Sequence, residues 1–331
     1  MLPTTEVESS ATTYARSTDQ TKAAGPSPSL LWEKVPCNLC GSWERDIKYE
    51  GTTDQDMEKM LKSYSASGNF ISQETLVQCK QCKLIFTSPR LRRDLILKGY
   101  TEAEDPTYVS QAEGRIKSFE RCLKAVTKYQ ASGRILDVGA AAGFFLKVAK
   151  EAGWETYGIE PSMYLSQYGN THYNANIHCG TIETVPPFEK QMDVVTLWDV
   201  LEHTFEPKDV LQRCNRYLRQ GGIVVINYPN IGNWMAKAAG RKYWFILSVH
   251  LYYFVPETIA EMLQKTGFEV LADAPHYQWL QLGYLLYRLE AYVPKVAKLM
   301  GKIAKFLRCD QMLIPYYAAQ TRVIARKVNE V

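Results

Sequence analysis

The chain has 331 residues, of which 46% are hydrophobic, 22% charged and 12% aromatic, and this composition excludes a disordered, collagen-like or small disulfide-stapled protein. With 39 Lys and Arg against 35 Asp and Glu, the net charge of +4 is too small to indicate a nucleic-acid-binding protein, so no nucleic acid partner is expected. The sequence shows no run of 18 uncharged apolar residues and no basic N-terminal region followed by an apolar one. We therefore expect a cytoplasmic protein.

The composition changes along the chain and suggests three parts. Residues 1–30 are rich in Ser, Thr, Ala and Pro and have no apolar periodicity, so we expect a disordered tail. A cysteine-bearing module with a connector is expected over 31–111. Residues 112–331 are expected to form a larger domain, which contains a long insertion at 277–310.

Four cysteines form two matched pairs. Cys37 and Cys40 make one Cys-x-x-Cys pair, and Cys79 and Cys82 make another. Four thiolates suit a tetrahedral zinc ion, and an all-cysteine site leaves no position for water, so the zinc is expected to be structural. A redox-active pair or buried free cysteines are the alternatives. A loop or helix around 53–64 is expected to join the pairs. The remaining cysteines are expected to pack in the interior: Cys122, Cys179, Cys214 and Cys309.

From Gly133 onward, short apolar runs alternate with amphipathic stretches, which predicts repeated β-α units and a doubly wound parallel sheet. The predicted strands are Arg134 to Val138, Glu155 to Ile159, Asn176 to Cys179, Val194 to Trp198 and Ile223 to Asn227. The predicted helices are Ala112 to Gln130, Phe144 to Glu151, Pro207 to Arg219 and Pro256 to Lys265. Two later apolar stretches are expected to complete the sheet, Phe268 to Ala272 and Thr321 to Ala325.

A glycine turn follows the first strand of this domain. In ILDVGAAAGFF, Asp137 ends the strand, and Gly139 and Gly143 flank a turn into a helix, where a ligand can approach bare backbone. The dinucleotide fingerprint would need glycine where Ala141 stands, so pyrophosphate binding is disfavoured. Glu160 ends the next strand 21 positions after Gly139, a spacing at which a carboxylate accepts hydrogen bonds from ribose hydroxyls. The alternative is a turn without ligand, with Glu160 as a solvated charge.

These pieces resemble the class I S-adenosylmethionine (SAM)-dependent methyltransferases, a family that includes ubiquinone-type O-methyltransferases and sugar C-methyltransferases. The resemblance rests on ILDVGAAAGFF, YGIEPS, GTIETVP, DVVTLWDVLEH, LRQGGIVVINYPN and HLYYFVPETI. It implies an α/β fold, a Rossmann-like seven-stranded mostly parallel sheet whose last strand is antiparallel, and methyl transfer to a small-molecule acceptor. The residues it assigns to the cofactor are Asp137, Gly139, Ala141 and Gly143 at the methionyl arm, Glu160 at the ribose, Thr181 and Ile182 beside adenine, and Asp199 beneath the cofactor.

The cysteine module is similar to the zinc ribbon of a subset that includes sugar C-methyltransferases, and CKQCKLIFTSPR carries this likeness. In that subset a Tyr and an acidic residue stand where this chain has Leu247 and Val249. The resemblance therefore implies O-methylation of a sugar, a lipid-linked or an aromatic substrate. Sugar C-methylation is the alternative, and a non-catalytic SAM-binding or zinc-scaffold protein is another.

Two histidines follow sheet strands and are candidates for a catalytic base. His203 closes the segment DVLEH, and His250 lies in SVHLYYF; an imidazole can accept a hydroxyl proton as the methyl group transfers. Glu202 could fix the tautomer of His203 or only cap a turn. The alternative for both histidines is a loop-shaping hydrogen bond to backbone. His172, His178 and His276 are expected to be structural or at the surface.

Two aromatic or basic segments have open roles. Residues 234–253, with Arg241 and Lys242, are expected to form part of the acceptor cavity or a lid, or else ordinary surface packing. Residues 277–309 have six basic side chains and one acidic, with lysines and apolar residues at helical spacing. A helix in this segment could contact an anionic membrane surface through 285–308. The favoured alternative is a helix that packs its apolar face on the sheet. The oligomeric state is left open.

Overall fold

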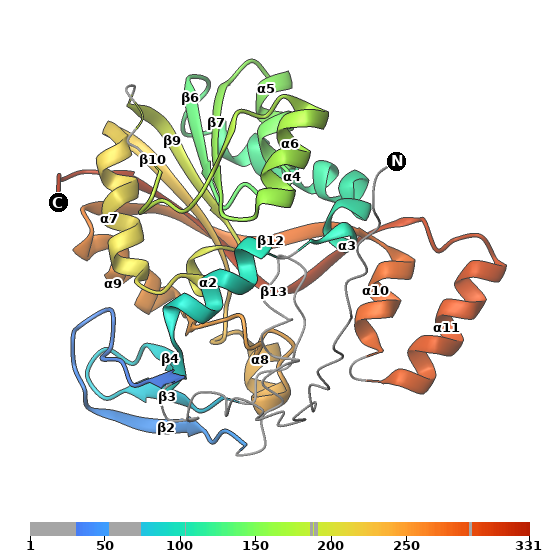
Figure 1. Cartoon of the computed structure of the whole chain (residues 1–331), viewed down its shortest axis with the longest axis horizontal. Helices are drawn as coiled ribbons and strands as arrows, with labels where there is room; N and C mark the ends of the chain where they lie inside the picture. The colour runs from blue at the N-terminus through green and yellow to red at the C-terminus, as the bar shows by residue number, and fades with distance from the viewer. Residues whose placement is uncertain (1–30, 53–73, 103, 186–187, 189–190, 291–292) are drawn as a thin grey trace, which may run out of the picture.

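The computed structural model describes residues 31–52, 74–102, 104–185, 188, 191–290 and 293–331. The expected tail at 1–30 and the expected junction at 53–64 lie outside the described residues. The larger part of the molecule is one seven-stranded sheet covered by helices, and a smaller β-module packs below it (Figure 1).

The large sheet has the strand order β12-β13-β10-β9-β6-β7-β8. All neighbours from β10 to β8 pair in parallel, whereas β13 is antiparallel to both β10 and β12. The expected fold class is confirmed, and the five strands predicted from 134 to 227 are all present. Their bounds are β6 Arg134–Val138, β7 Glu155–Glu160, β8 Ile177–Cys179, β9 Met192–Trp198 and β10 Leu218–Pro229.

The last two strands are much longer than the apolar runs that predicted them. β12 spans Phe268–Gln281 and β13 spans Leu313–Lys327, and they remain paired as far as Gln281 opposite Leu313. The residues from 277 to 281, where the insertion was expected to begin, thus continue β12 beyond the part of the sheet that pairs with β10. The polar and aromatic residues beyond the sheet continue the strand because they pair with each other as a two-stranded ribbon.

Helices cover both faces of the sheet, and each strand alternates its side chains between them. On one face, Ile135 and Val194 pack against helices α4 Ala112–Val126 and α5 Phe144–Glu151. On the other face, Leu136 and Val195 pack against α7 Pro207–Tyr217 and α9 Pro256–Lys265. Helix α6, Met163–Tyr173, lies beside α5 and follows β7. This two-sided burial explains the nearly continuous apolar runs of the strands.

The cysteine module forms a four-stranded sheet of order β11-β4-β3-β2, and β11 comes from the segment that follows β10 of the large sheet. The bounds are β2 Arg45–Tyr49, β3 Leu76–Cys79, β4 Ile85–Thr87 and β11 Tyr252–Tyr253. A separate pair joins β1 Trp32–Glu33 to β5 Arg90–Leu91. The module is thus joined by strand pairing to the segment that follows β10, and both share one hydrophobic cluster with α7 and α9.

Short helices link the module to the large sheet and follow its strands. Helices α2 Arg93–Glu102 and α3 Pro106–Ser110 precede α4, and neither was predicted. After β9 comes the 3-10 turn η2 Leu201–His203, and after β10 come α8 Trp234–Ala239 and the 3-10 turn η3 Gly240–Lys242.

Between β12 and β13 the chain forms a helical hairpin, α10 Leu282–Leu289 and α11 Pro294–Phe306, which stands out from the body in Figure 1. The prediction that the basic helix packs its apolar face on the sheet is wrong. Helix α11 packs chiefly on α10, through the small side chains Ala297 and Ala304. Among the helices that the structure describes, none combines the length and apolarity needed to cross a membrane.

Candidate active site

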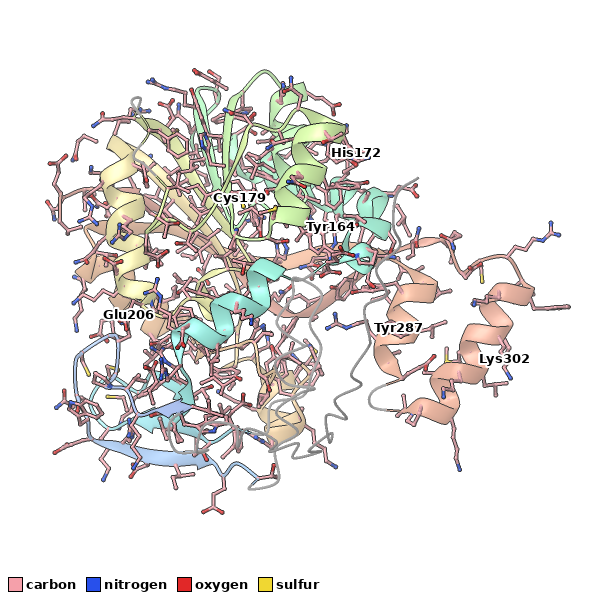
Figure 2. All side chains as sticks on the ribbon, viewed as in Figure 1. Tyr164, His172, Cys179, Glu206, Tyr287 and Lys302 are labelled. Atoms are coloured by element: carbon pink, nitrogen blue, oxygen red, sulfur yellow. The ribbon has the colours of Figure 1, made fainter. Side chains whose placement is uncertain are left out.

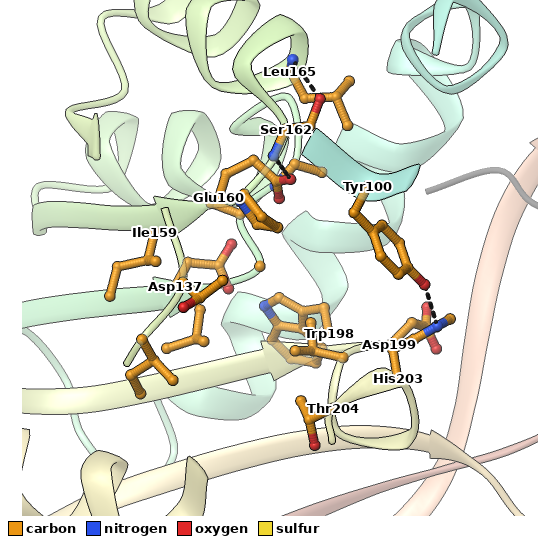
Figure 3. Close-up of a pocket in the computed structure, with 18 of the residues that line it drawn as sticks. Tyr100, Asp137, Ile159, Glu160, Ser162, Leu165, Trp198, Asp199, His203 and Thr204 are labelled. Carbon is orange, nitrogen blue, oxygen red and sulfur yellow. Dashed lines mark hydrogen bonds between the residues drawn. The ribbon is translucent and has the colours of Figure 1, made fainter. Parts of the chain in front are cut away.

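A deep pocket opens at the carboxyl ends of β6, β7 and β9, next to the position where the strand order reverses. Parallel α/β sheets bind ligands at this kind of switch point because the loops on the two sides diverge there. Figure 3 shows the strand-end residues Asp137, Glu160 and Asp199 around this pocket. The structure therefore brings together three acidic residues that the sequence singled out separately.

Two positions in the turn after β6 require glycine, Gly139 and Gly143. Gly139 has φ +72°, and a Cβ there would lie 2.5 Å from a methyl group of Val200. Gly143 has φ +74°, directly precedes α5, and a Cβ there would lie 2.8 Å from Ala175. Ala141 has φ +46°, a left-handed conformation that is strained for any residue with a Cβ. The two glycines are therefore required by backbone conformation and close packing, and Gly139 and Ala141 of this turn line the pocket.

Glu160 is held by two backbone donors. Its Oε2 accepts from Ala141 N–H at 2.8 Å, and its Oε1 accepts from Ser162 N–H at 2.8 Å. Burial raises the pKa of Glu160 to about 7, and the two backbone hydrogen bonds oppose this rise. Each carboxylate oxygen has a second lone pair, so the group can accept from ligand hydroxyls without losing its support.

Asp137 and Asp199 are also buried carboxyl groups on the pocket wall. Asp137 Oδ1 accepts from the Thr196 hydroxyl at 2.6 Å, and burial raises the pKa of Asp137 to about 8. Asp199 Oδ1 accepts from Gln320 Nε2 at 2.6 Å. Burial raises the pKa of Asp199 to about 6, and the nearby Arg115 opposes this rise. Three carboxyl groups that ionise near neutral pH make the pocket attractive to a cation.

Thr181 and Ile182 follow β8 and line the same pocket. Ile182 is buried, and the Thr181 N–H is taken by the Thr184 hydroxyl at 2.9 Å. All eight residues proposed from sequence for a cofactor thus lie in or directly beside one cavity, and Gly143 contributes by starting α5.

The sequence did not point to the largely aromatic wall of the pocket, part of which packs against the glycine turn. This wall comes from the helices before β6 and from the end of β9, and comprises Tyr100, Tyr108, Arg115, Phe119 and Trp198. The Arg115 guanidinium lies 3.8 Å from the centre of the Tyr108 ring. The indole N–H of Trp198 has no hydrogen-bond partner among the described residues. These residues lie on three separate helices and one strand, so no periodicity along the chain marks them.

His203 lines the pocket, whereas His250 lies behind it. The two rings are 4.6 Å apart between centroids, in an edge-on arrangement. His203 Nδ1 lies 2.9 Å from the carbonyl oxygen of Val249 and 2.9 Å from the Tyr100 hydroxyl, which Figure 3 also shows. Burial lowers the pKa of His203 to about 4, so its ring is neutral at physiological pH.

The hydrogen bonds of both imidazoles indicate the same tautomer. A carbonyl oxygen can only accept, so Nδ1 of His203 carries the proton and Nε2 keeps a lone pair. His250 Nδ1 lies 2.8 Å from the carbonyl of Phe245, which leaves its Nε2 as an acceptor as well. Glu202 is 1% exposed, and neither carboxylate oxygen has a partner in the described structure. Potential metal-ligating atoms of Glu202, His203 and His250 lie within 4.8 Å of one another.

The two cysteine pairs come together at one point of the module. The ligand atoms of Cys37, Cys40, Cys79 and Cys82 lie within 4.8 Å of one another, and all four are free thiols. The Cys37 and Cys82 sulfurs are 3.3 Å apart, much longer than a disulfide and close to the spacing of thiolates around one zinc ion. The turns match as well: Gly41 N–H donates to Cys37 O, and Lys83 N–H donates to Cys79 O.

Several other expectations can be compared with the structure. In the described chain no residue of 234–253 lines the pocket; this segment is largely buried against the cysteine module instead. Cys122 and Cys214 are buried as expected, but Cys179 is exposed, so the prediction of interior packing is wrong for it. His172 and His178 are exposed, and Figure 2 labels His172 and Cys179. His276 is buried and stacks on Trp198.

Comparison with known proteins shows to which family this part of the chain belongs. The family model described as "Methyltransferase domain" matches residues 108–273, which is half of the chain. A ubiquinone biosynthesis O-methyltransferase of a Bradyrhizobium species is 30% identical over 137 residues, covering 40% of this chain and 52% of that protein. The enzyme with the same name from Coxiella burnetii is 23% identical over 187 residues, and the match covers 53% of this chain and 78% of that enzyme. The chain spans about half the length of the curated relatives that it matches first.

Solved structures give a more distant likeness. A SAM-dependent methyltransferase from Archaeoglobus fulgidus is 18% identical with a TM-score of 0.45, covering 67% of this chain and all of that one. The magnesium protoporphyrin IX methyltransferase of Synechocystis, solved with bound SAM, is 12% identical with a TM-score of 0.41, covering 65% of this chain and 80% of that one.

Proposed function

Because this chain belongs to the methyltransferase-domain family and is a class I SAM-dependent methyltransferase, we propose that it transfers the methyl group of SAM to a hydroxyl oxygen of an aromatic small molecule. The observation that supports this most directly is the position of His203, which lies on the wall of the same pocket as Glu160 and the glycine turn and bonds to Val249 O through Nδ1. The matched O-methyltransferases support oxygen as the acceptor atom.

We assign the cofactor to the pocket between the glycine turn and Glu160. The residues fit, because the carboxylate of Glu160 retains lone pairs for ribose hydroxyls and the buried Asp137 and Asp199 complement a cationic ligand. Gly139 and Ala141 would contact the methionyl arm on the pocket wall, and Gly143 would support this turn through its close packing on Ala175. Thr181 and Ile182 would flank the adenine. When bound, SAM supplies an electrophilic methyl carbon and departs as the neutral thioether.

In this proposal His203 is the general base. The acceptor oxygen forms its bond to the methyl carbon as the carbon–sulfur bond breaks, and the hydroxyl proton passes to Nε2 of His203. The bonds from Nδ1 to Val249 and Tyr100 keep the ring in the tautomer that leaves Nε2 free. His250 contacts His203 from behind the pocket and acts as a positioning residue.

The chemistry of the base favours an aromatic acceptor. A neutral imidazole accepts a proton more readily from a phenol, with a pKa of about 10, than from a far less acidic sugar hydroxyl. Among the aromatic residues that line the pocket, the half-buried Tyr100 would offer its ring to a flat acceptor. The Tyr108 ring already stacks on Phe144 and contacts Arg115. Arg115 beside Tyr108 would favour an acceptor with an anionic substituent.

We further propose that Cys37, Cys40, Cys79 and Cys82 hold a structural zinc ion. The module that they would stabilise contacts the base region directly: Thr87 N–H donates to Leu251 O at 2.9 Å, and Arg90 donates to Phe205 O at 3.0 Å. Zinc would thus support the segments that carry His203 and His250.

The experiment offers the purified protein SAM with either a catechol or a nucleotide-linked sugar. Production of S-adenosylhomocysteine and the carbon-13 NMR spectrum of the product identify the substrate and the methylated atom. We expect an O-methyl product from the catechol. His203→Gln should lower kcat by about 100-fold with unchanged SAM affinity, whereas the exposed His172→Gln should not change it. A carbon–methyl product from the sugar would establish the alternative, C-methylation.

A further inference from the structure

The hairpin of α10 and α11 is attached to the body at one end only. Helix α10 contacts β12, and α11 packs chiefly on α10. Within α11 only Ala297 and Ala304 are buried, and they lie seven residues apart on the side that faces α10. The other sides of the helix are therefore available to something outside the described chain.

The exposed part of this hairpin contains a continuous apolar face. Phe306 is 86% exposed and Leu299 60% exposed, values that are unusual for large apolar side chains in a folded protein. The complete apolar face of α11 and the turn after it is Val296, Leu299, Met300, Ile303, Phe306 and Leu307. A contiguous exposed apolar face of this kind marks an interaction site.

Basic side chains occupy the other exposed side of the same helix. At 3.6 residues per turn, Lys295, Lys298, Lys302 and Lys305 fall together, and Lys295 and Lys302 border Leu299 and Phe306. All four lysines are exposed, and Figure 2 labels Lys302 on the projecting helix. From 282 to 308 the sequence has six basic residues and one acidic, a net charge of +5 against +4 for the whole chain.

This combination fits a lipid surface better than a protein partner. The centres of protein interfaces are depleted of lysine, whereas helices that lie in the membrane interface combine an apolar face with lysines along the polar side. Long lysine side chains can reach the phosphate groups of lipids while their methylene chains stay near the acyl region. The strong positive charge selects an anionic bilayer.

The base of the hairpin is close to the pocket. Gln281, the residue before α10, accepts a hydrogen bond from Gln111 Nε2 at 3.3 Å, and Gln111 follows the helix that carries Tyr108. Tyr284 on α10 is buried and close enough to Arg115 to interact with it electrostatically. The base of the hairpin is therefore close to the pocket that we assign to SAM and the acceptor, while α11 projects away from it.

We propose that the face of α11 formed by Val296, Leu299, Met300, Ile303, Phe306 and Leu307, together with its four lysines, docks the protein on an anionic lipid bilayer. The helix lies parallel to the bilayer plane, inserts its apolar face below the headgroups and pairs its lysines with lipid phosphates. This inference does not depend on the identity of the methyl acceptor.

The test is sedimentation of the full chain with vesicles, comparing phosphatidylcholine with a mixture of phosphatidylcholine and phosphatidylglycerol. We expect binding only to the mixed vesicles, weakened by added salt. Lys298→Glu with Lys302→Glu should lower the vesicle affinity by at least about tenfold. Leu299→Ser with Phe306→Ser should lower it as strongly.

Matched controls change comparable side chains elsewhere. Lys124→Glu with Lys128→Glu makes the same charge change at exposed positions in and after α4, and Trp234→Ser removes an aromatic side chain that is 73% exposed. Both should bind vesicles like the unaltered protein. SAM binding by calorimetry checks that each variant is folded.

Two outcomes would overturn the proposal. The first is that the unaltered protein does not sediment with mixed vesicles, or that the α11 variants sediment as well as the controls. The second is a dimer in lipid-free buffer, measured by light scattering, that Leu299→Ser with Phe306→Ser converts to a monomer without vesicle binding. The face would then be covered by a second copy of the chain.

Discussion

The backbone N–H of Ala141 donates a hydrogen bond to Oε2 of Glu160, at 2.8 Å. This bond ties the turn after β6 to the carboxylate at the end of β7, so the two parts of the proposed cofactor site cannot move independently. It also keeps Ala141 at φ +46°, a conformation that alanine rarely adopts.

Ala141→Gly should stabilise the fold. Glycine removes the penalty of about 1–2 kcal/mol for a Cβ in the left-handed region, but the unfolded chain gains freedom, so the net gain in the free energy of unfolding should be about 0.5–1 kcal/mol. Urea denaturation measures it. Ala142→Gly is the control, because Ala142 is buried and has no positive φ; it should destabilise the protein. A destabilised Ala141→Gly variant would contradict the strain argument.

Glu160→Gln should weaken SAM binding by about 10- to 100-fold. The glutamine side chain has no negative charge. Its NH2 group would also replace a carboxylate oxygen that now accepts from Ala141 N–H or Ser162 N–H, so one backbone donor would lose its acceptor. Isothermal calorimetry gives the dissociation constant. Glu269→Gln, at an exposed position on β12, should leave it unchanged. Equal affinity in both variants would remove Glu160 from the site.

SAM affinity should rise with pH. In the ligand-free protein, burial raises the pKa of Asp137 to about 8 and that of Glu160 to about 7. A bound cation favours the ionised carboxylates, so binding releases protons and strengthens as pH rises through these values. Calorimetry in buffers with different ionisation enthalpies measures the released protons. S-adenosylhomocysteine lacks the sulfonium charge and should show a smaller dependence. Affinity that is independent of pH from 6 to about 9 would contradict this prediction.

The same groups predict the opposite trend for the stability of the ligand-free fold. The pKa values of Asp137 and Glu160 in the folded protein lie above the value of about 4 in the unfolded chain. Their contribution to the free energy of unfolding is therefore fully present below pH 4 and is lost as pH rises through about 7 to 8. The increase in Tm on adding SAM should consequently be larger at pH 8.5 than at pH 6, by differential scanning fluorimetry at about these two values.

Removal of the proposed zinc should lower the Tm by at least about 5 °C, because a structural metal contributes directly to folding. Cys79→Ser tests this by thermal unfolding together with elemental analysis for zinc. Cys179→Ser is the control, since Cys179 is an exposed thiol outside the cluster. A Cys79→Ser protein with the original Tm, or an unaltered protein purified without zinc, would show that the four thiols are not a metal site.

Local patterns were sufficient for much of the sheet and for the strand-end residues. β6 and α5 have the bounds that were predicted, because a fully buried strand and an amphipathic helix each leave a complete signature in consecutive residues. Gly139 and Glu160 could be paired from spacing alone, since carboxyl ends of adjacent parallel strands meet at one edge.

Other features depend on contacts between distant segments. The hydrogen bond between Tyr100 and His203 joins residues that are 103 positions apart, and no pattern along the chain indicates it. The apolar residues of α11 have the same amphipathic spacing as those of α7, yet α7 packs on the sheet and α11 does not. The long ribbon of β12 and β13 carries α11 away from the sheet.

The sequence by itself determined the alternating β-α order, the glycine turn, the acidic strand ends and the two cysteine pairs, because each is encoded by neighbouring residues. Only the tertiary structure decided which histidine faces the pocket, which aromatic residues form its wall and which helix face is left exposed. The physical reason is that burial and hydrogen bonding of a side chain depend on which distant segments pack against it.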